Sequence, residues 1–290
     1  MEWLGHTEYG LLQCHHTLDP VPDPGAFPMH THTELEFLYF ISGSVRYCVE
    51  GQLYPLQPGD ILLMRIGESH SLQIDPSQPY ERAVIHFSPE LLAGERWAHL
   101  LLPFTDRPLG CMNQYHASEL PDEFIRQCME RLFSREPADG EQRILAYLLP
   151  VLQEVYDVWQ RRTSGDFVQP HQELSAQLVT YINLHLGELD SLSQLEKRFF
   201  LSQSQINRIF RRSTGTSVWE YVQIKRLFAA REMLYTGTSP CQAAQASGYR
   251  EYSTFYRAYK KRFGHAPQQD QRRVSENEPE KGAERASEMR

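Results

Sequence analysis

The sequence has 290 residues, of which 41% are hydrophobic and 23% charged, and these globular values are enough for a core in each of two domains. No apolar run approaches the roughly 20 residues of a membrane span, and no basic segment precedes an apolar one at the start, which argues against a membrane protein and a signal peptide. The five cysteines form no Cys-x-x-Cys pair, so a reduced, cytoplasmic protein is expected.

The net charge of −8 is unevenly distributed along the chain. Residues 1–171 hold 11 basic and 24 acidic side chains, a net charge of −13, whereas residues 172–273 hold 15 and 8, a net charge of +7. A polyanion such as DNA is therefore expected as a partner of the second part alone.

Residues from about 27 to 87 are predicted to form an antiparallel sandwich or barrel. Apolar or alternating runs such as LEFLYFISGSVRYCVEG and ERAVIHFSP are broken by turn residues at Gly43, Gly51 and Pro58–Gly59. Strands that follow each other every 8–12 residues or so, without helices between them, are typical of these architectures.

Two amphipathic helices are predicted next, in PDEFIRQCMERLFSRE and EQRILAYLLPVLQEVYDVWQRR. Pro150 is expected to kink the second one. Its apolar stripe consists of Ile144, Leu148, Leu152, Val155 and Trp159. Such a stripe packs into the core of its own domain or pairs with a second copy. Because it lies outside the basic part, we expect a homodimer, with residues 116–162 as a helical dimerisation region and 163–171 as a linker.

The basic part contains two copies of one short helix, LSQSQINRIFRRSTG from residue 201 and YSTFYRAYKKRFG from residue 252. Ser202 is expected to cap the first copy. Helical spacing places these apolar side chains on the inner faces: Ile206, Ile209, Phe210, Phe255, Tyr259 and Phe263. It places these polar side chains on the outer faces: Ser204, Asn207, Arg208, Ser253, Tyr256 and Arg257.

A shorter amphipathic helix precedes each copy, beginning near Ser191 and near Pro240, and about three to four residues join each pair. This is the spacing of a helix-turn-helix motif, in which the second helix enters the major groove of DNA. The outer faces are therefore predicted to read bases. The later basic residues are predicted to bind phosphates: Arg211, Arg212, Lys260 and Lys261. A helical bundle with solvated basic faces is the alternative, but two faces in the same register favour DNA binding.

About 95 residues from LVTYINLHLGELD onward resemble the DNA-binding domain of AraC/XylS-type transcription regulators. The most specific pieces are NRIFRRSTG, YVQIKRLFAAREML and SGYREYSTFYRAYKKRFGHAP. The resemblance implies two helix-turn-helix units on one rigid linker helix, which read adjacent major-groove turns. Glu196 stands where the family usually has alanine, Phe200 where it has glycine in the first turn, and Asp270 where an aromatic-Arg ending is usual.

The acidic part contains His30, His32 and Glu36 in the spacing H-x-H-x3-E, followed by GDILLMRIGESH with His70. These segments resemble the two motifs of cupin barrels. On one strand, the first three side chains would share a face, and His70 would join them from a neighbouring strand. Three imidazoles and a carboxylate suit Mn, Fe(II), Ni or Zn. Metal-dependent catalysis, a metal without chemistry, an organic effector and a structural polar cluster are the alternatives.

The family resemblance favours an organic effector in this pocket, a sugar for example, and no cofactor. Tyr39, Phe40 and Tyr47 would suit stacking on a sugar, but aromatic residues on strands more often belong to the core. The expected fold is α+β, with a cupin-like antiparallel β-barrel at 1–115, the helical region, and an all-α tandem helix-turn-helix domain at 172–270. A disordered charged tail is predicted at 271–290.

The expected function is that of a DNA-binding transcription regulator, not an enzyme. Double-stranded DNA and a small-molecule effector are its predicted partners, and RNA polymerase is a further one. The alternative is a metal-dependent cupin enzyme with a helical appendage.

Overall fold

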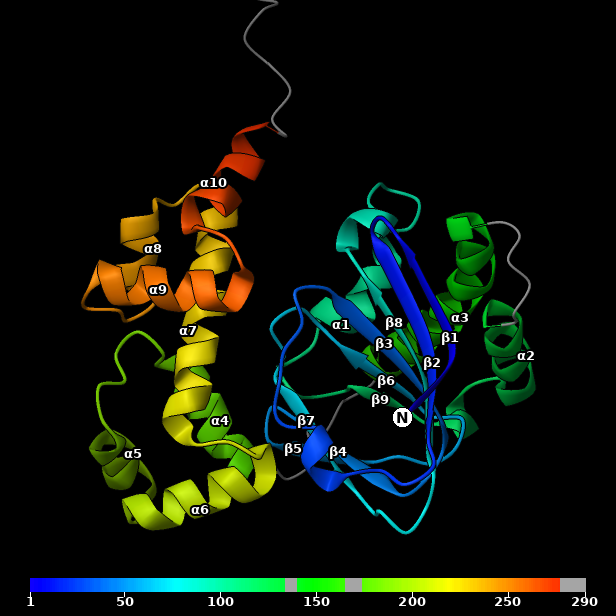
Figure 1. The fold of residues 1–290 in the computed structure, drawn as a ribbon, viewed down its shortest axis with the longest axis horizontal. Coiled ribbons are helices and arrows are strands. Elements are labelled where there is room, and N and C mark those ends of the chain that lie inside the picture. Colours follow the sequence, from blue (N-terminus) through cyan, green and yellow to red (C-terminus); the bar gives the residue numbers. More distant parts are fainter. Residues whose placement is uncertain (134–139, 165–173, 277–290) are drawn as a thin grey trace, which may run out of the picture. The chain divides into compact units, whose positions relative to one another are not determined.

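The computed structural model describes residues 1–133, 140–164 and 174–276. The chain forms two compact units, the first containing residues 1–179 and 209–216 and the second containing residues 180–208 and 217–290 (Figure 1). Within the described ranges all strands belong to the first unit. Each unit is described by itself.

Two antiparallel sheets form the β part of the first unit, in the strand orders β1-β2-β8-β3-β6-β9 and β5-β4-β7. The strands are β1 (Glu2–Tyr9), β2 (Leu12–Asp19), β3 (Leu35–Ser42), β4 (Val45–Val49), β5 (Gln52–Pro55), β6 (Ile61–Met64), β7 (His70–Ile74), β8 (Tyr80–Phe87) and β9 (Gln114–Tyr115). The predicted turns at Gly43, Gly51 and Pro58–Gly59 are confirmed. The sequence interpretation missed β1 and β2. Strand β1 is an edge strand with little buried surface, which weakens its pattern, whereas β2 lies between β1 and β8.

Strand β3 is buried on both faces, which explains why LEFLYF shows no polar alternation. Phe37 and Tyr39 pack in one apolar cluster with side chains of two helices, at Asp122–Leu132 and Gly140–Thr163, whereas Leu38 and Phe40 pack in another with strands of the three-stranded sheet. Because side chains alternate along a strand, Glu36 is on the same side as Leu38 and Phe40, between the two sheets.

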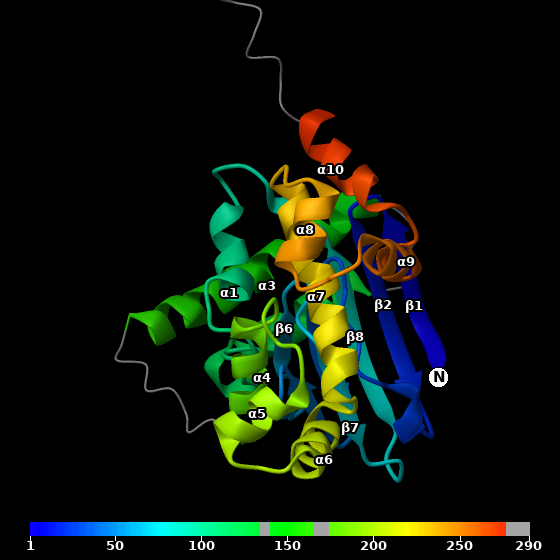
Figure 2. The same ribbon diagram turned by 90° about the vertical axis from the view of Figure 1, so that its left-hand side faces the viewer.

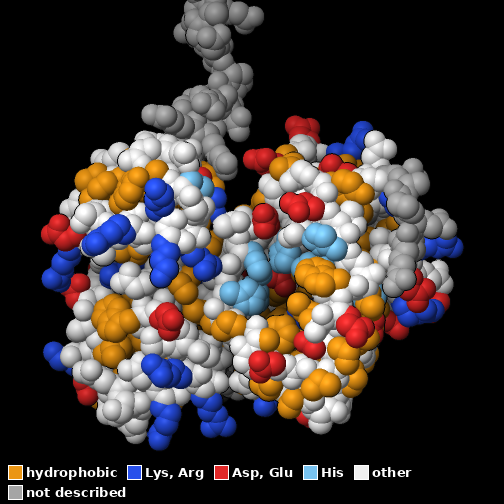
Figure 3. All heavy atoms as spheres, in the orientation of Figure 1, with side chains coloured by type: hydrophobic (Ala, Val, Ile, Leu, Met, Phe, Trp, Pro, Cys, Tyr) orange, Lys and Arg blue, Asp and Glu red, His pale blue; other side chains and the backbone are white. Residues whose placement is uncertain are grey.

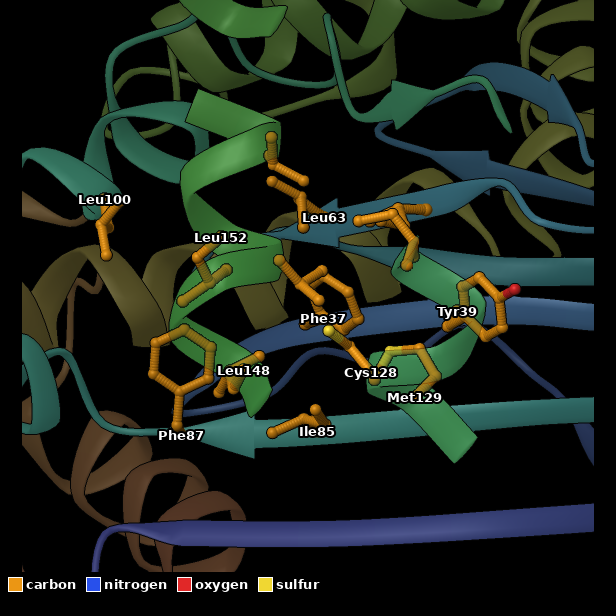
Figure 4. Packing of buried hydrophobic residues seen from close by; sticks show 14 of the residues in the cluster. Phe37, Tyr39, Leu63, Ile85, Phe87, Leu100, Cys128, Met129, Leu148 and Leu152 are labelled. Carbon is orange, nitrogen blue, oxygen red and sulfur yellow. The ribbon is translucent and has the colours of Figure 1, made fainter. Parts of the chain in front are cut away.

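Helices α2 (Asp122–Leu132) and α3 (Gly140–Thr163) pack on the other side of the six-stranded sheet. Figure 4 shows Leu148 and Leu152 of α3 and Met129 of α2 against Phe37 and Ile85. The predicted stripe of α3 lies in this core, and its members are at most 7% exposed. Its interpretation as a core stripe is confirmed, and it is not available to a second copy.

Short helical segments complete the first unit: Pro24–Ala26, Pro89–Leu92, Ala98–Leu101, α1 (Leu102–Thr105) and Ala117–Glu119. Helix α3 continues through Pro150 and ends at Thr163, where the predicted linker begins. The rest of that linker, 165–171, lies outside the described residues.

Residues 174–276 form helices joined by short connections, as the sequence predicted for 173–269 (Figure 2). The helices are α4 (Leu174–Leu184), α5 (Leu192–Phe199), α6 (Gln203–Thr214), α7 (Val218–Tyr235), α8 (Pro240–Ala246), α9 (Tyr252–Phe263) and α10 (Pro267–Glu276). Helix α10 extends past Gln271 into the predicted disordered tail. The remainder of that tail, 277–290, lies outside the described residues.

The residue Asp270, which departs from the family pattern, is fully buried and fastens α10 to its neighbours. Its carboxylate accepts hydrogen bonds from Tyr259 on α9 and from Arg231 Nε on α7, the latter at 3.1 Å. Burial raises the pKa of the Tyr259 hydroxyl well above its ordinary value, and the bond to Asp270 raises it further. The unusual carboxylate therefore has buried partners that compensate its charge.

Candidate functional site

Five side chains converge between the two sheets and are called here the histidine–glutamate cluster: His30, His32, Glu36, His70 and His86. Glu36 comes from β3, His86 from β8 and His70 from the start of β7. Histidine side chains gather in one patch on the surface of the first unit (Figure 3).

One carboxylate oxygen, Glu36 Oε2, is the centre of the cluster. It lies 2.9 Å from Nε2 of His32, 3.2 Å from Nε2 of His70 and 3.4 Å from Nε2 of His86. Glu36 and His70 are almost fully buried, and His32 is the most exposed of the three imidazoles. The ring nitrogens of His30, His32 and His70 also lie within 4.8 Å of one another.

Two of these rings are oriented by backbone carbonyls. Nδ1 of His30 lies 2.8 Å from the Pro28 carbonyl oxygen, and Nδ1 of His70 lies 2.9 Å from the Glu68 carbonyl oxygen. Because a carbonyl only accepts, each Nδ1 carries the hydrogen, and in the neutral ring Nε2 presents its lone pair. Both rings are thus prepared to bind a proton or a metal ion at Nε2.

The charges within the cluster are strongly coupled. Burial raises the pKa of Glu36, but the imidazole of His70 and the bonds from the other rings outweigh burial and hold that pKa well below its usual range. Burial lowers the pKa of His70, and the Glu36 carboxylate more than reverses this. Burial and the neighbouring His70 lower the pKa of His30 to about 4. The cluster can therefore hold a cation beside Glu36.

The predicted side chains do lie together, but the prediction that one strand carries His30, His32 and Glu36 was wrong. His30 forms an isolated bridge with His70, and His32 lies in a loop, so neither shares a strand with Glu36. His70 belongs to the other sheet. His86 was missed, although it sits directly opposite Glu36 in the β3–β8 register. The signal available for it was the strand YERAVIHF, whose alternate residues Tyr80, Arg82, Val84 and His86 share a face.

Tyr39, Phe40 and Tyr47 all belong to apolar core clusters, as aromatic residues on strands more often do, and they do not lie together as one stacking surface. Phe40 and Tyr47 lie in the core between the sheets, and the Tyr47 hydroxyl is 2.6 Å from that of Tyr80. Tyr39 points to the opposite side of β3, where it lines a pocket of about 470 Å³ with Met129 and Phe133. The histidine–glutamate cluster does not line that pocket.

A buried ionic network fixes the segment that carries His70. The Glu68 carboxylate is fully buried and accepts two hydrogen bonds from Arg107, at 2.9 and 2.7 Å. It also accepts bonds from the backbone of Arg65 and Gly110 and from the side chain of Asn113. Burial raises the pKa of Glu68, but Arg107 and the other donors lower it to about 2. Arg65 thus belongs to this network through its backbone N–H.

The first helix-turn-helix unit is α5 and α6. Ser191 and Gln194 form a capping box at the start of α5, and the Ser202 hydroxyl accepts from the backbone of Gln205 at the start of α6, at 3.3 Å. Ile206 and Phe210 are fully buried. Of the predicted DNA contacts on α6, these are exposed or half-exposed: Ser204, Asn207, Arg208, Arg211 and Arg212.

Helices α8 and α9 form the second helix-turn-helix motif. Pro240 occupies the first turn of α8 after the cap Ser239, as predicted. Phe255 and Tyr259 are fully buried, and the predicted DNA contacts on α9 are exposed or half-exposed: Ser253, Tyr256, Arg257, Lys260 and Lys261. Five residues, 247–251, join α8 to α9, which is longer than the predicted three to four.

A single arginine of the linker helix α7 connects the two motifs. The buried Arg226 donates from Nε to the Leu186 carbonyl at 2.9 Å and from Nη2 to the Leu189 carbonyl at 2.8 Å, both in the loop before α5. Its Nη1 donates to the Gly248 carbonyl at 3.0 Å, in the turn between α8 and α9. A Cβ at Gly248 would lie 2.7 Å from this guanidinium, so the contact needs glycine there.

Phe200 occupies the turn between α5 and α6 in the left-handed conformation, with φ of 55°, and its side chain is 92% exposed. A bulky residue is strained there, and it gains no burial. Replacing Phe200 by glycine should therefore raise the free energy of unfolding by about 1 kcal/mol. The opposite change is Gly264→Ala, at a residue with φ of 80° and no atom of a described residue within 4 Å of an added Cβ. It should lower the free energy of unfolding by a similar amount. Urea unfolding of both variants tests this, and a destabilised Phe200→Gly chain would contradict it.

Two family models match this chain: "AraC-like ligand binding domain" over residues 23–150 and "Helix-turn-helix domain" over residues 195–273. Together they match more than half of the chain. The chain therefore belongs to the AraC family of DNA-binding transcription regulators that carry an N-terminal ligand-binding domain. Within the described ranges, no helix combines the length and apolar character that crossing a membrane requires.

Curated relatives agree with this family. The probable transcriptional regulator LumQ of Photobacterium leiognathi is 33% identical over 88 residues, which are 30% of this chain and 36% of LumQ. The uncharacterized HTH-type transcriptional regulator YfiF of Bacillus subtilis is 22% identical over 246 residues, 82% of this chain and 77% of YfiF. The regulatory protein SoxS of Salmonella typhimurium is 28% identical over 98 residues, 33% of this chain and 92% of SoxS.

Solved structures give similar but weaker matches. ToxT from Vibrio cholerae, crystallised with a bound unsaturated fatty acid, covers 91% of this chain and 95% of its own, with 11% identity and a TM-score of 0.39. A probable AraC family regulator from Rhodopseudomonas palustris covers 34% of this chain and 94% of its own, with 27% identity and a TM-score of 0.32.

Proposed function

We propose that this regulator reads its operator through the exposed faces of α6 and α9. The observation that supports this is the matched arrangement of the two helices, each with a buried aromatic core face and a basic outer face. Arg208 and Arg257 are assigned to guanine, Asn207 to adenine, and the serines and Tyr256 to neighbouring groups on the bases. The assigned phosphate contacts are Arg211, Arg212, Lys260 and Lys261.

Selection of random oligonucleotides with the full chain tests DNA reading and supplies the operator sequence. On that operator, Arg208→Ala should cost about 1–3 kcal/mol and relax the preference at one base pair. Arg212→Ala should weaken all sequences alike, and wild-type affinity should fall as salt rises, because phosphate contacts release counterions. If both variants lose affinity while keeping the same base preference, the division into base readers and phosphate contacts is wrong.

We propose further that the histidine–glutamate cluster is the effector site of the N-terminal domain. Support comes from the buried Glu36 carboxylate and the three imidazoles, of His32, His70 and His86, whose Nε2 atoms lie within 3.4 Å of its Oε2 between the sheets. A specific effector should raise the melting temperature of the full chain, because a ligand that binds only the folded state stabilises it. The arrangement of Tyr39, Phe40 and Tyr47 gives no support to a sugar.

Several properties of the regulator are also proposals. We infer that it acts by binding and not by catalysis, since two matched basic helices have no use in an enzyme. Because chromosomal DNA is its proposed binding partner, we infer that the regulator is cytoplasmic. It is also proposed to be a homodimer and to act on RNA polymerase. The buried α3 stripe cannot supply the interface; Phe124 on α2, 41% exposed, is an apolar side chain open to a partner. Light scattering that shows a monomer at micromolar concentration would contradict the homodimer.

A further inference from the structure

We propose that the pocket between helix α2 and the six-stranded sheet binds a small organic amine that is protonated at neutral pH and has an apolar body. This pocket of about 470 Å³ is called here the α2 pocket. It is separate from the histidine–glutamate cluster, because side chains alternate along β3 and those of Glu36 and Tyr39 therefore point to opposite faces of the sheet. The site goes beyond the proposed function and does not depend on it.

The inner walls of the α2 pocket are apolar. Ile41 of β3 and Ala83 of β8 belong to the sheet side, whereas Met129 of α2 and Phe133 at its end belong to the helix side. The ring of Tyr39 adds to this surface, and Figure 4 shows it beside Met129. Pockets of about 300–1,000 Å³ with apolar walls and a few polar groups are typical small-molecule sites. We therefore expect the body of the ligand to be apolar.

The first polar contact that the α2 pocket offers is the hydroxyl of Tyr39. This residue is only 6% exposed, and its hydroxyl makes no hydrogen bond to any residue that the structure describes. Figure 4 shows its oxygen directed away from the other labelled side chains. Burial and, after it, the negative charge of Asp122 raise the pKa of this hydroxyl to about 12, so it stays protonated at neutral pH. Its oxygen can therefore accept a hydrogen bond from a ligand.

The charged side chains around the α2 pocket favour a cation. Among the described residues that line it are three carboxylates and one guanidinium, those of Glu81, Asp122, Glu130 and Arg126. The Glu81 carboxylate lies 2.8 Å from Nε2 of His16, and that of Glu130 forms an ion pair with Arg126. The Asp122 carboxylate forms no ion pair within the described ranges. The lining is thus negative, and a cleft of one sign of charge attracts ligands of the opposite sign.

The ammonium group is expected between Asp122 and Tyr39. Of the charges that shift the pKa of the Tyr39 hydroxyl, that of Asp122 has the largest effect, so the two groups are close. Asp122 also lies against the turn at Pro58–Gly59, since a Cβ added at Gly59 would lie 2.9 Å from its Oδ1. An ammonium group has three N–H donors and can donate to both side chains at once, while the ligand's body covers Met129 and Phe133.

Three dansyl compounds test the charge of the ligand, because their shared fluorophore brightens and shifts to the blue in apolar surroundings. At neutral pH dansylcadaverine is a cation, dansylamide is uncharged and dansylglycine is an anion. Dansylcadaverine added to the full chain should give a signal that saturates at one equivalent. Dansylamide should bind at least about tenfold more weakly, because it lacks the ammonium group, and dansylglycine more weakly still. Absence of saturable binding, or equal binding of the three compounds, would overturn the proposal.

A matched pair of substitutions tests the position of the ammonium group. Asp122→Asn should weaken dansylcadaverine binding at least about fivefold and leave dansylamide binding unchanged. Glu123→Gln makes the same change of charge at the next residue of α2, which is exposed and does not line the pocket, and should bind the probe as the wild type does. Equal weakening by both substitutions would show that the probe responds to the general acidity of α2, and the assignment would fall.

Two further variants test the walls, and circular dichroism checks that each is folded. Tyr39→Phe keeps the ring and removes the hydroxyl, so it should weaken dansylcadaverine binding about threefold or more. Ile41→Trp fills the pocket and should weaken the binding of dansylcadaverine and dansylamide together. Wild-type binding of dansylcadaverine in Asp122→Asn and in either of these variants would place the probe elsewhere and overturn the site. Because the titrations contain no DNA, they decide this site even if the chain retards no oligonucleotide and the proposed function fails.

Discussion

Replacing Glu68 by glutamine should lower the free energy of unfolding by about 3–5 kcal/mol, because it leaves the buried guanidinium of Arg107 without a counter-charge. Arg107 would keep hydrogen bonds to the backbone carbonyls of Pro103, Cys111 and Leu63, but no negative charge beside it. Urea unfolding of the full chain, followed by circular dichroism in both proteins, measures the difference.

The pH dependence of the same difference has a definite sign. The folded-state pKa of Glu68 is depressed to about 2 from an ordinary value of 4.5, so its stabilising contribution is complete above pH 4.5 and is lost as the pH falls toward 2. The wild type should therefore approach the stability of Glu68→Gln in acid. Glu123→Gln, which breaks an exposed ion pair with Arg126, is the matched control and should change little. A gap between wild type and Glu68→Gln that stays constant with pH would contradict this assignment.

Replacing Arg226 by methionine should cost about 3 kcal/mol of stability, since three carbonyl oxygens in two loops lose their donors together. Methionine keeps much of the apolar stem, so the loss reports the guanidinium. Thermal unfolding of the full chain measures the effect. Arg250→Met, whose side chain is 81% exposed and pairs with Asp190, is the control and should unfold nearly as the wild type does.

The same variant should also bind the selected operator about tenfold more weakly at a temperature where it remains folded. Two linked binding units gain affinity only when both can engage at once, and Arg226 holds the loop before one motif and the turn within the other. Sequence preference should be unchanged, because Arg226 is buried and not on the basic faces. Wild-type affinity in a folded Arg226→Met chain would show that the rest of α7 fixes the motifs unaided.

The DNA-binding helices could be predicted from the sequence because their determinants are local. A helix repeats every 3.6 residues, so the spacing of Ile206 and Phe210 and of Phe255 and Tyr259 identifies the buried face. The capping residue Ser202 and the first-turn proline Pro240 each mark a helix start by their own residue type. Family resemblance then supplied the function that these faces serve.

The histidine–glutamate cluster was only partly predictable. His30, His32 and Glu36 are close in sequence and were found by their spacing, although the strand expected to carry them begins only at Leu35. His86 lies 50 residues from Glu36, and its position depends on the β3–β8 register. A shift of that register by one residue would turn His86 to the other face of the sheet, and only the packing of both faces selects the observed one.

The α3 stripe and Arg226 show the same limit of sequence-based prediction. The pattern of Ile144 to Trp159 defines an apolar face but does not say whether the chain's own sheet or a second copy covers it; the tertiary structure places it on the sheet. Arg226 reads in the sequence as one more basic residue, yet its three acceptors come from two loops. Periodicity and capping depend on neighbours along the chain and are visible in the sequence. Which distant segment covers an apolar face depends on which surfaces exclude water together, and this is determined only in the tertiary structure.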